Sequence, residues 1–174
     1  MNTKSVATML LALAGVACQD VTVARDYQVV GMTEAMTTRV KSALRTWNSG
    51  DQVVPESRNT IEIATADDEV EYLKAPCAVA TTLRIETENS ERYVHVLFRA
   101  RAFTEGADTS AVLLHEIGHS LQFLAEGRGV EDHAEHLGEG NIMSPGARAA
   151  VALPTDKDYE FVGTTRPVTN GFAP

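Results

Sequence analysis

The sequence has little positive charge, only two cysteines, and no long hydrophobic run beyond its first residues. Its 174 residues carry 15 Lys and Arg against 24 Asp and Glu, a formal net charge of −9. Nucleic acids and anionic membranes bind clustered Lys and Arg, and no basic stripe is present, so neither partner is expected. No segment reaches the roughly 20 apolar residues of a transmembrane helix. With 44% hydrophobic residues and no repeats, the chain fits one globular domain.

Residues 1–17 have the pattern of a secretory signal. A single positive charge, Lys4, precedes an apolar run over residues 6–16, and small residues stand before Cys18. The run is too short to remain in a bilayer as a permanent helix. We therefore expect residues 18–174 to form one exported domain that is secreted, periplasmic or anchored to the cell surface.

The two cysteines leave two alternatives open. Cys18 stands where a bacterial lipoprotein signal places its lipidated cysteine, although Gly15 occupies a position where such signals usually carry leucine. The competing use of Cys18 is a disulfide with Cys77, which an oxidising compartment would permit. A lipid anchor at Cys18 and a disulfide therefore both remain open.

Hydrophobic periodicity predicts an α+β domain. Residues 33–48 place Met36, Val40, Leu44 and Trp47 on one face of a helix, and their first residue is a suitable cap. Strands are expected at 59–65, 78–86 and 92–100, turns at 67–68 and 89–90, and further helices from 108–110 to Gly127 and from the cap Thr155 onward. The segment between the last two helices is rich in glycine and should be mostly loop.

His115, Glu116 and His119 form the pattern H-E-x-x-H inside the predicted second long helix. Two histidines one turn apart project from the same helical face, so both imidazoles can bind one zinc ion. Glu116 lies beside them and can accept a proton from a zinc-activated water and pass it to a departing amine. Random placement would produce these three letters roughly 0.01 times in such a chain, so the match is informative. A catalytic zinc usually has three protein ligands, which leaves a third to be found.

Two short segments resemble the metzincin zinc endopeptidases, and their matrixin-like members most. The family pattern is H-E-x-x-H-x-x-G-x-x-H followed by a methionine turn. The matching segments are HEIGH at 115–119 and NIMSP at 141–145, with Met143 as the turn methionine. The resemblance implies a small twisted mixed sheet with a helix packed on it, an active-site helix, and a C-terminal part that holds the methionine turn and a short helix. The chain departs from the pattern at Gln122, where the family has glycine, and at Ala125, where it has the third histidine.

The third ligand must then come from the loop after the helix, where His136 and His133 are the candidates. His136 precedes Met143 by seven residues and His133 by ten. The shorter spacing is closer to that of matrixin-like proteins and favours His136. Glu139 is a further alternative, because another plan for zinc peptidases uses a glutamate from a downstream helix. Glu139 lies between two glycines, however, which argues against a helix there.

The sequence therefore predicts an exported zinc-dependent endopeptidase that acts as a monomer on a protein or peptide substrate. One zinc ion is the expected cofactor, whereas a structural calcium ion leaves no readable mark. The substrate is expected to lie extended along an edge strand near 92–100 and to pair through its backbone. Residues 144–153 would line a pocket beyond the methionine turn. Two alternatives stay open: a zinc-binding scaffold without activity, and a metal-free exported binding module.

Overall fold

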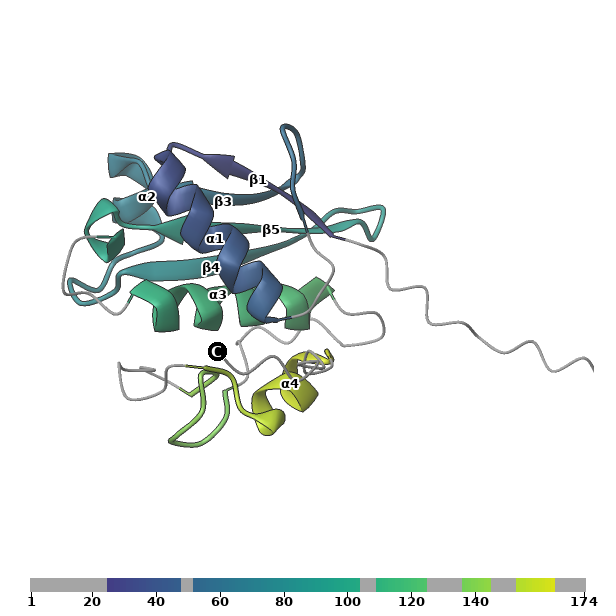
Figure 1. Cartoon of the computed structure of the whole chain (residues 1–174). Helices are drawn as coiled ribbons and strands as arrows, with labels where there is room; N and C mark the ends of the chain where they lie inside the picture. The colour runs from purple at the N-terminus through teal and green to yellow at the C-terminus, as the bar shows by residue number, and fades with distance from the viewer. Residues whose placement is uncertain (1–24, 48–51, 104–108, 125–135, 145–152, 165–174) are drawn as a thin grey trace, which may run out of the picture.

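The computed structural model describes residues 25–47, 52–103, 109–124, 136–144 and 153–164. In chain order the elements are β1 (Asp26–Val30), α1 (Glu34–Thr46), β2 (Gln52–Val53), β3 (Asn59–Ile63), α2 (Ala66–Glu71), β4 (Ala80–Glu86), β5 (Arg92–Phe98), the short 3-10 helix η1 (Ala100–Phe103), α3 (Thr109–Leu124) and α4 (Asp156–Val162). The strands form one mixed five-stranded sheet, so the predicted α+β class is confirmed. α1 and α3 pack against each other, α3 packs against β4 and β5, and α4 lies on the side of α3 away from the sheet (Figure 1).

The order of strands across the sheet is β2-β1-β3-β5-β4. Every neighbouring pair is parallel except β4 and β5, which are antiparallel. β4 is therefore an edge strand and β5 is not, so the expectation of an edge strand near 92–100 is wrong. β5 carries the fully buried Val94, Val96 and Phe98. β5 lies between β3 and β4, so its backbone groups are paired on both sides. At an edge of the sheet, the groups on one side would remain unpaired.

The structure contains four elements that the sequence patterns do not predict: β1, β2, α2 and η1. The expected turn at residues 67–68 is wrong, because these residues lie in the first turn of α2. Thr65 and Asp68 start that helix with a capping box, in which each side chain bonds the backbone N–H of the other. β1 lies between β2 and β3, and its Tyr27 is fully buried, so tertiary pairing stabilises a strand whose own five residues show no clear alternation.

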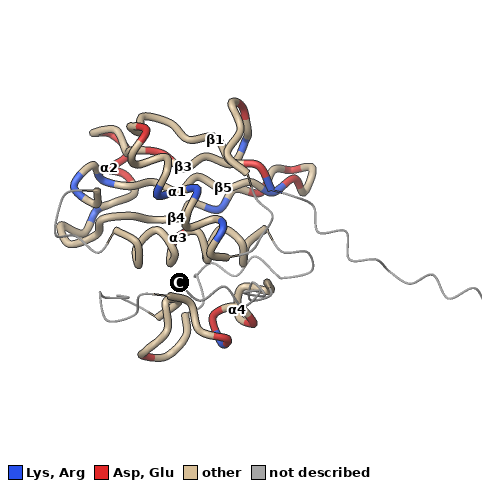
Figure 2. The backbone as a smooth tube through the Cα atoms, viewed as in Figure 1, with Lys and Arg blue, Asp and Glu red and all other residues tan. Residues whose placement is uncertain are grey.

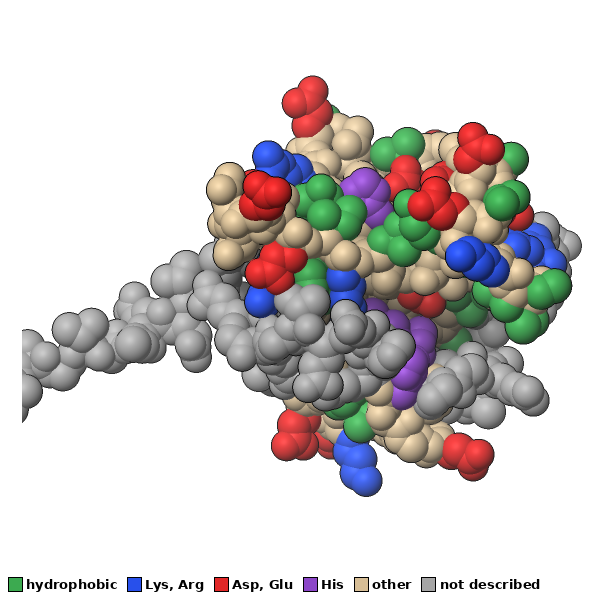
Figure 3. All heavy atoms as spheres, turned by 180° about the vertical axis from the view of Figure 1, so that it is seen from behind, with side chains coloured by type: hydrophobic (Ala, Val, Ile, Leu, Met, Phe, Trp, Pro, Cys, Tyr) green, Lys and Arg blue, Asp and Glu red, His purple; other side chains and the backbone are tan. Residues whose placement is uncertain are grey.

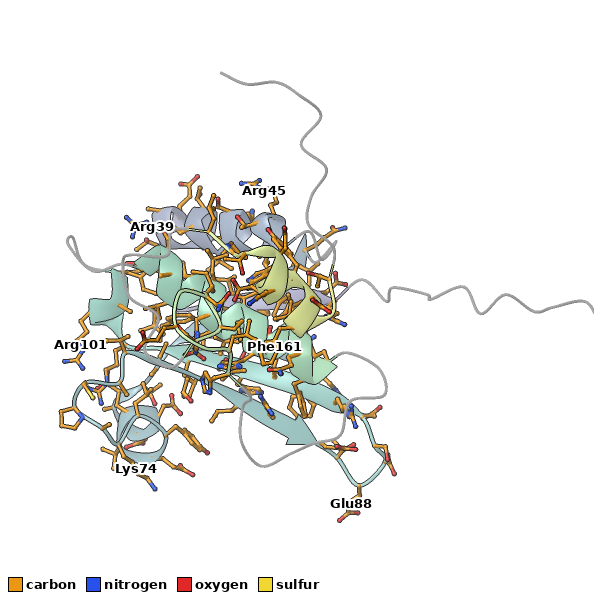
Figure 4. The ribbon with its side chains drawn as sticks, turned by 90° about the horizontal axis from the view of Figure 1, so that it is seen from below. Arg39, Arg45, Lys74, Glu88, Arg101 and Phe161 are labelled. Atoms are coloured by element: carbon orange, nitrogen blue, oxygen red, sulfur yellow. The ribbon has the colours of Figure 1, made fainter. Side chains whose placement is uncertain are left out.

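α1 begins after Thr33 and packs its predicted apolar face into the core. The Thr33 side chain accepts a hydrogen bond from a backbone N–H of the first turn, as its predicted capping role requires. At the other end, the indole N–H of Trp47 donates to the Leu114 carbonyl oxygen in α3 at 2.9 Å. Arg39 and Arg45 lie on the outward side of the helix (Figure 4). α1 thus holds α3 in place by buried packing and by one buried hydrogen bond.

α3 and α4 occupy the predicted segments. α3 runs from Thr109 to Leu124, and its predicted end at Gly127 lies outside the described residues. α4 follows the predicted cap Thr155 and ends at Gly163, whose φ of 75° is the left-handed conformation that glycine adopts readily. Seen from below, α4 lies in front of α3 (Figure 4), and the two helices are in contact.

The described residues include no membrane-spanning helix and form no concentrated basic face. None of the described helices is both long and apolar enough to cross a bilayer. Lys and Arg of the described residues are dispersed over several elements and alternate with acidic residues (Figure 2). Residues 1–17 and Cys18 lie outside the described ranges, so the signal and the lipid anchor stay predictions. Cys77 is exposed, and its pairing with Cys18 also stays a prediction.

Candidate metal centre

Three histidine side chains converge between α3 and the C-terminal segment. His115 and His119 project from one face of α3, and their Nε2 atoms lie 3.0 Å apart. The ring of His136 lies 5.4 Å from that of His115 and 4.9 Å from that of His119. One nitrogen from each of the three rings lies within 4.8 Å of the other two. His136 is exposed. Figure 3 shows histidine side chains at the surface, between the part with the sheet and the C-terminal segment.

Hydrogen bonds at the far side of two rings set which nitrogen is free. The Nδ1–H of His115 donates to the Ile142 carbonyl oxygen at 2.7 Å. The Nδ1 of His119 lies 3.5 Å from the side-chain oxygen of Gln122, which can only accept. Because Nδ1 carries the proton in each neutral ring, both Nε2 atoms present lone pairs to each other. Two lone pairs at 3.0 Å repel unless a cation lies between them.

Burial keeps these imidazoles neutral. Desolvation lowers the pKa of His115, against a smaller raising effect of its bond to Ile142. Burial, together with the nearby imidazoles of His115 and His136, lowers the pKa of His119 to about 3. A proton is therefore a poor occupant of the space between the two Nε2 atoms at neutral pH, and the rings are available as ligands.

The spacing of the nitrogens fits a metal ion. Two nitrogens bound to one tetrahedral zinc at about 2.0 to 2.1 Å lie about 3.3 Å apart. The Nε2 atoms of His115 and His119 are 3.0 Å apart, close to that value. Hydrogen bonds from the non-ligating nitrogens, as seen for both rings, are the usual support of metal-bound histidines. The cluster is therefore compatible with a bound metal ion held by three imidazoles.

The segment that carries His136 folds back on itself beside the predicted methionine turn. The Leu137 N–H donates to the Met143 carbonyl oxygen at 2.8 Å, which places His136 beside the end of that turn. The turn is closed by the Ser144 N–H, which donates to the Asn141 carbonyl oxygen at 3.2 Å. One short segment thus supplies a candidate ligand and also the Ile142 carbonyl that orients His115.

Met143 is fully buried against α3 at Gly118. A Cβ on Gly118 would overlap the Met143 sulfur and would also lie 3.0 Å from the ring of Trp47. The sequence predicts that this thin side of the helix admits a backbone or a substrate; the described structure places a methionine side chain there instead. Glycine between the two histidines therefore lets the turn pack directly on the helix that carries them.

Glu116 is fully buried beside the histidines. Its Oε2 accepts a hydrogen bond of 2.6 Å from the Thr82 hydroxyl on the edge strand β4. Burial raises the pKa of Glu116 to about 7, although the bond from Thr82 acts in the opposite direction. A carboxyl group with such a pKa can both take up and release a proton near neutral pH, as a general base and acid must.

Two further candidate ligands, His133 and Glu139, were predicted from the sequence. His133 lies outside the described residues, so its role as a ligand stays a prediction. Glu139 is exposed and is not among the clustered groups, and its neighbours form a turn, not a helix. His95, expected to be an ordinary strand residue, lies on the sheet with its Nδ1 3.3 Å from a carboxylate oxygen of Glu62.

Three residues contribute to the site without having been predicted to do so. Gln122, noted only as a departure from the family pattern, bonds His119 from three residues away, a spacing that brings side chains together on a helix. Asp158 lies in the first turn of α4, and its Oδ1 accepts a hydrogen bond from the Met143 N–H at 2.9 Å. Thr82 carries no sequence signal, since its contact depends on how the sheet meets α3.

The arrangement unites three imidazoles, of which that of His136 is exposed to solvent, and a buried carboxyl group. These are the groups that metal-assisted hydrolysis needs, and they come from α3 and from the segment around the turn. Comparisons with protein-family profiles, with characterised proteins and with solved structures found no match for this chain.

Proposed function

We propose that the protein is an exported zinc-dependent endopeptidase of the metzincin type. The observation that carries the proposal is the convergence of His115, His119 and His136, whose ligating nitrogens lie within 4.8 Å of one another, beside a buried Glu116. The mixed sheet, the helix with both histidines, the buried Met143 and the closing helix support the same proposal, because each is a part that the resemblance implies.

Each residue of the site has one task in the proposed reaction. Zinc, when bound by the three imidazoles, supplies Lewis acidity that polarises a peptide carbonyl and makes water more acidic. Glu116 takes the proton of the attacking water and then transfers it to the nitrogen of the broken peptide bond. His115 is held in its ligating tautomer by Ile142, and His119 by Gln122. The chain itself therefore contributes ligand orientation and a mobile proton.

An extended peptide would pair with β4, which replaces the strand expected from the sequence. β4 is an edge of the sheet, and its Thr82 contacts Glu116, so this strand borders the proposed catalytic carboxyl group. Among the described strands β4 pairs with β5 alone, and an added strand binds at such an edge. The predicted pocket residues 145–152 lie outside the described ranges.

Metal content tests the ligand assignment. We expect purified wild-type protein to hold about one zinc ion per chain by elemental analysis, in agreement with a three-histidine site. His136→Ala should lose most of this zinc, whereas His133→Ala should retain it. Zinc well below one per chain in the wild type would instead indicate a metal-free binding module. Loss in His133→Ala alone would assign the third ligand to His133.

Hydrolysis of casein tests the enzyme itself. Glu116→Gln removes the proton acceptor but keeps the size of the side chain, so it should retain zinc and lose activity by at least about 100-fold. A matched control is His95→Gln, a substitution on the sheet away from the cluster, which should keep both zinc and activity. A zinc-loaded wild-type protein without measurable hydrolysis would indicate a scaffold and contradict the proposed function.

A further inference from the structure

The side chain of Thr82 is a polar group on the core-facing side of an edge strand. In the β4–β5 ladder Thr82 lies opposite Val96, and paired residues share one face of a sheet. Val96 is fully buried, so both side chains face the helices. The neighbouring inward positions of β5, Val94 and Phe98, are apolar and also fully buried. At this half-buried position, the Thr82 hydroxyl finds its hydrogen-bond partners on α3.

Both partners of the Thr82 hydroxyl belong to Glu116. The hydroxyl oxygen lies 2.6 Å from Oε2 of the carboxylate and 3.0 Å from the Glu116 backbone carbonyl oxygen. A hydroxyl has one proton to donate, and the shorter contact to the charged oxygen is the stronger bond. Among the described residues, Thr82 is the side chain that donates to this carboxylate. It thereby ties a buried carboxylate to the strand on which the substrate would pair.

From this geometry we propose that Thr82 is a positioning residue, which holds Glu116 by Oε2 and leaves Oε1 as the oxygen that exchanges the proton. The inference rests on the proposed function. Because the hydrogen bond uses Oε2 alone, it persists when Oε1 gains a proton from water and when Oε1 gives that proton to the leaving nitrogen. The carboxyl group then keeps one orientation through both steps, and misplacement of a catalytic group by about 1 Å can cost 100-fold in rate.

Steady-state kinetics of Thr82→Val and Thr82→Ser test the role, because valine keeps the shape of threonine and serine keeps its hydroxyl. We expect Thr82→Val to lower kcat by about 10- to 100-fold with little change in KM or zinc content. Thr82→Ser should recover kcat to within about threefold of the wild type. The matched control is Thr46→Val on α1, whose hydroxyl bonds only a carbonyl of its own helix; it should keep the wild-type kcat.

A second measurement uses metal-free protein and needs no activity. Thr82→Val should lower the urea midpoint of unfolding, because the buried carboxylate loses its donor. In a Glu116→Leu background, which has no carboxylate to hold, the same substitution should produce no further fall. Equal falls in the two backgrounds would mean that Thr82 acts by packing alone and would overturn the inference.

The kinetic outcomes separate this inference from the proposed function. Activity that survives Thr82→Val within twofold, or an equal loss in Thr82→Val and Thr82→Ser, would overturn the positioning role and leave the peptidase proposal standing. A rise in KM with unchanged kcat would also overturn it. If zinc-loaded wild type hydrolyses nothing, the proposed function fails and the positioning role fails with it.

Discussion

Two helices of this protein begin with the same side-chain pattern, but only one of them is attached to the candidate metal centre. α2 begins after Thr65 and has Asp68 as its third residue, and α4 begins after Thr155 and has Asp158 as its third residue; each pair forms a reciprocal capping box. Asp68 is half-buried, and its Oδ2 accepts the hydrogen bonds of its own helix start from the Thr65 N–H and hydroxyl. Asp158 is fully buried, and its second oxygen accepts the Met143 N–H at 2.9 Å.

The difference shows that a local motif acquires a structural role from what lies next to it. In α2 the box satisfies the orphan N–H groups of the first turn and nothing beyond. In α4 the same geometry leaves one carboxylate oxygen directed at the methionine turn. That turn carries the Ile142 carbonyl that orients His115, so Asp158 is linked to this candidate metal ligand through two hydrogen bonds.

The largest expected effect is that of Asp158→Ala, which removes the carboxylate that links the capping box of α4 to the candidate metal centre. The substitution leaves the buried N–H groups of Met143 and Thr155 without their acceptor. We expect a loss of about 3 kcal/mol in the free energy of unfolding, measured with urea. Zinc content should fall as well, because the turn no longer holds Ile142 and His136 in place. A loss under about 1 kcal/mol would show that the two boxes are equivalent.

Gly118→Ala tests whether packing of the turn on α3 matters as much as its hydrogen bond. Alanine normally favours a helix over glycine by about 1 kcal/mol. Here the added methyl overlaps the Met143 sulfur, so we expect a net loss of about 1 to 3 kcal/mol. Differential scanning calorimetry of the metal-free protein would measure it. A gain in stability would show that the turn yields easily and that Asp158 alone fixes it.

Asn141→Ala removes a hydrogen bond to the Thr155 hydroxyl. The capping box of α4 has this contact, and that of α2 has no counterpart to it among the described residues. The side-chain oxygen of Asn141 lies 2.8 Å from the Thr155 hydroxyl, and its amide donates to the Gly138 carbonyl oxygen at 3.0 Å. Both groups are partly accessible to water, so we expect a loss of about 1 kcal/mol with urea. Thr155→Val in the Asn141→Ala background should then cost less than in the wild type.

The smallest effect is expected from Asp68→Asn, in the capping box of α2. Hydrogen bonds from Thr65 lower the pKa of Asp68, so the ionised form stabilises the fold above the pKa of the unfolded chain, about 4. That stability is lost as the pH falls through the folded pKa. We expect the variant to be slightly less stable than the wild type at pH 7, and the difference to vanish below about pH 3. A difference that grows in acid would contradict this assignment.

Elements with a strong local signal could be predicted, and elements formed by pairing could not. The face of α1, the caps Thr33 and Thr155, and the helix with His115 and His119 follow from periodicity and capping. β1 could not be predicted, because five residues with an irregular pattern become a strand only between two neighbours. Which strand forms the edge depends on the order of strands, and single-strand patterns do not encode it.

The same distinction between local signals and long-range contacts applies to the candidate site. The i, i+4 spacing on one helix brings His115 and His119 together in any structure that keeps α3 helical, and Glu116 necessarily lies beside them. The place of His136 could be predicted only as one of two alternatives, since its approach depends on how the chain returns after the helix. The contacts of Thr82 with Glu116 and of Asp158 with the Met143 N–H join segments that sequence reasoning had no cause to group.

Short-range geometry along the chain was enough to establish an α+β protein with two histidines and a glutamate on one helix, because a helix turns the same way wherever it lies. The orientation of those rings, the burial and raised pKa of Glu116, and the approach of His136 arose only when the turn at Met143 packed on Gly118 and β4 met α3. Burial and hydrogen bonds between distant segments produce these properties, and neither exists until the chain has folded.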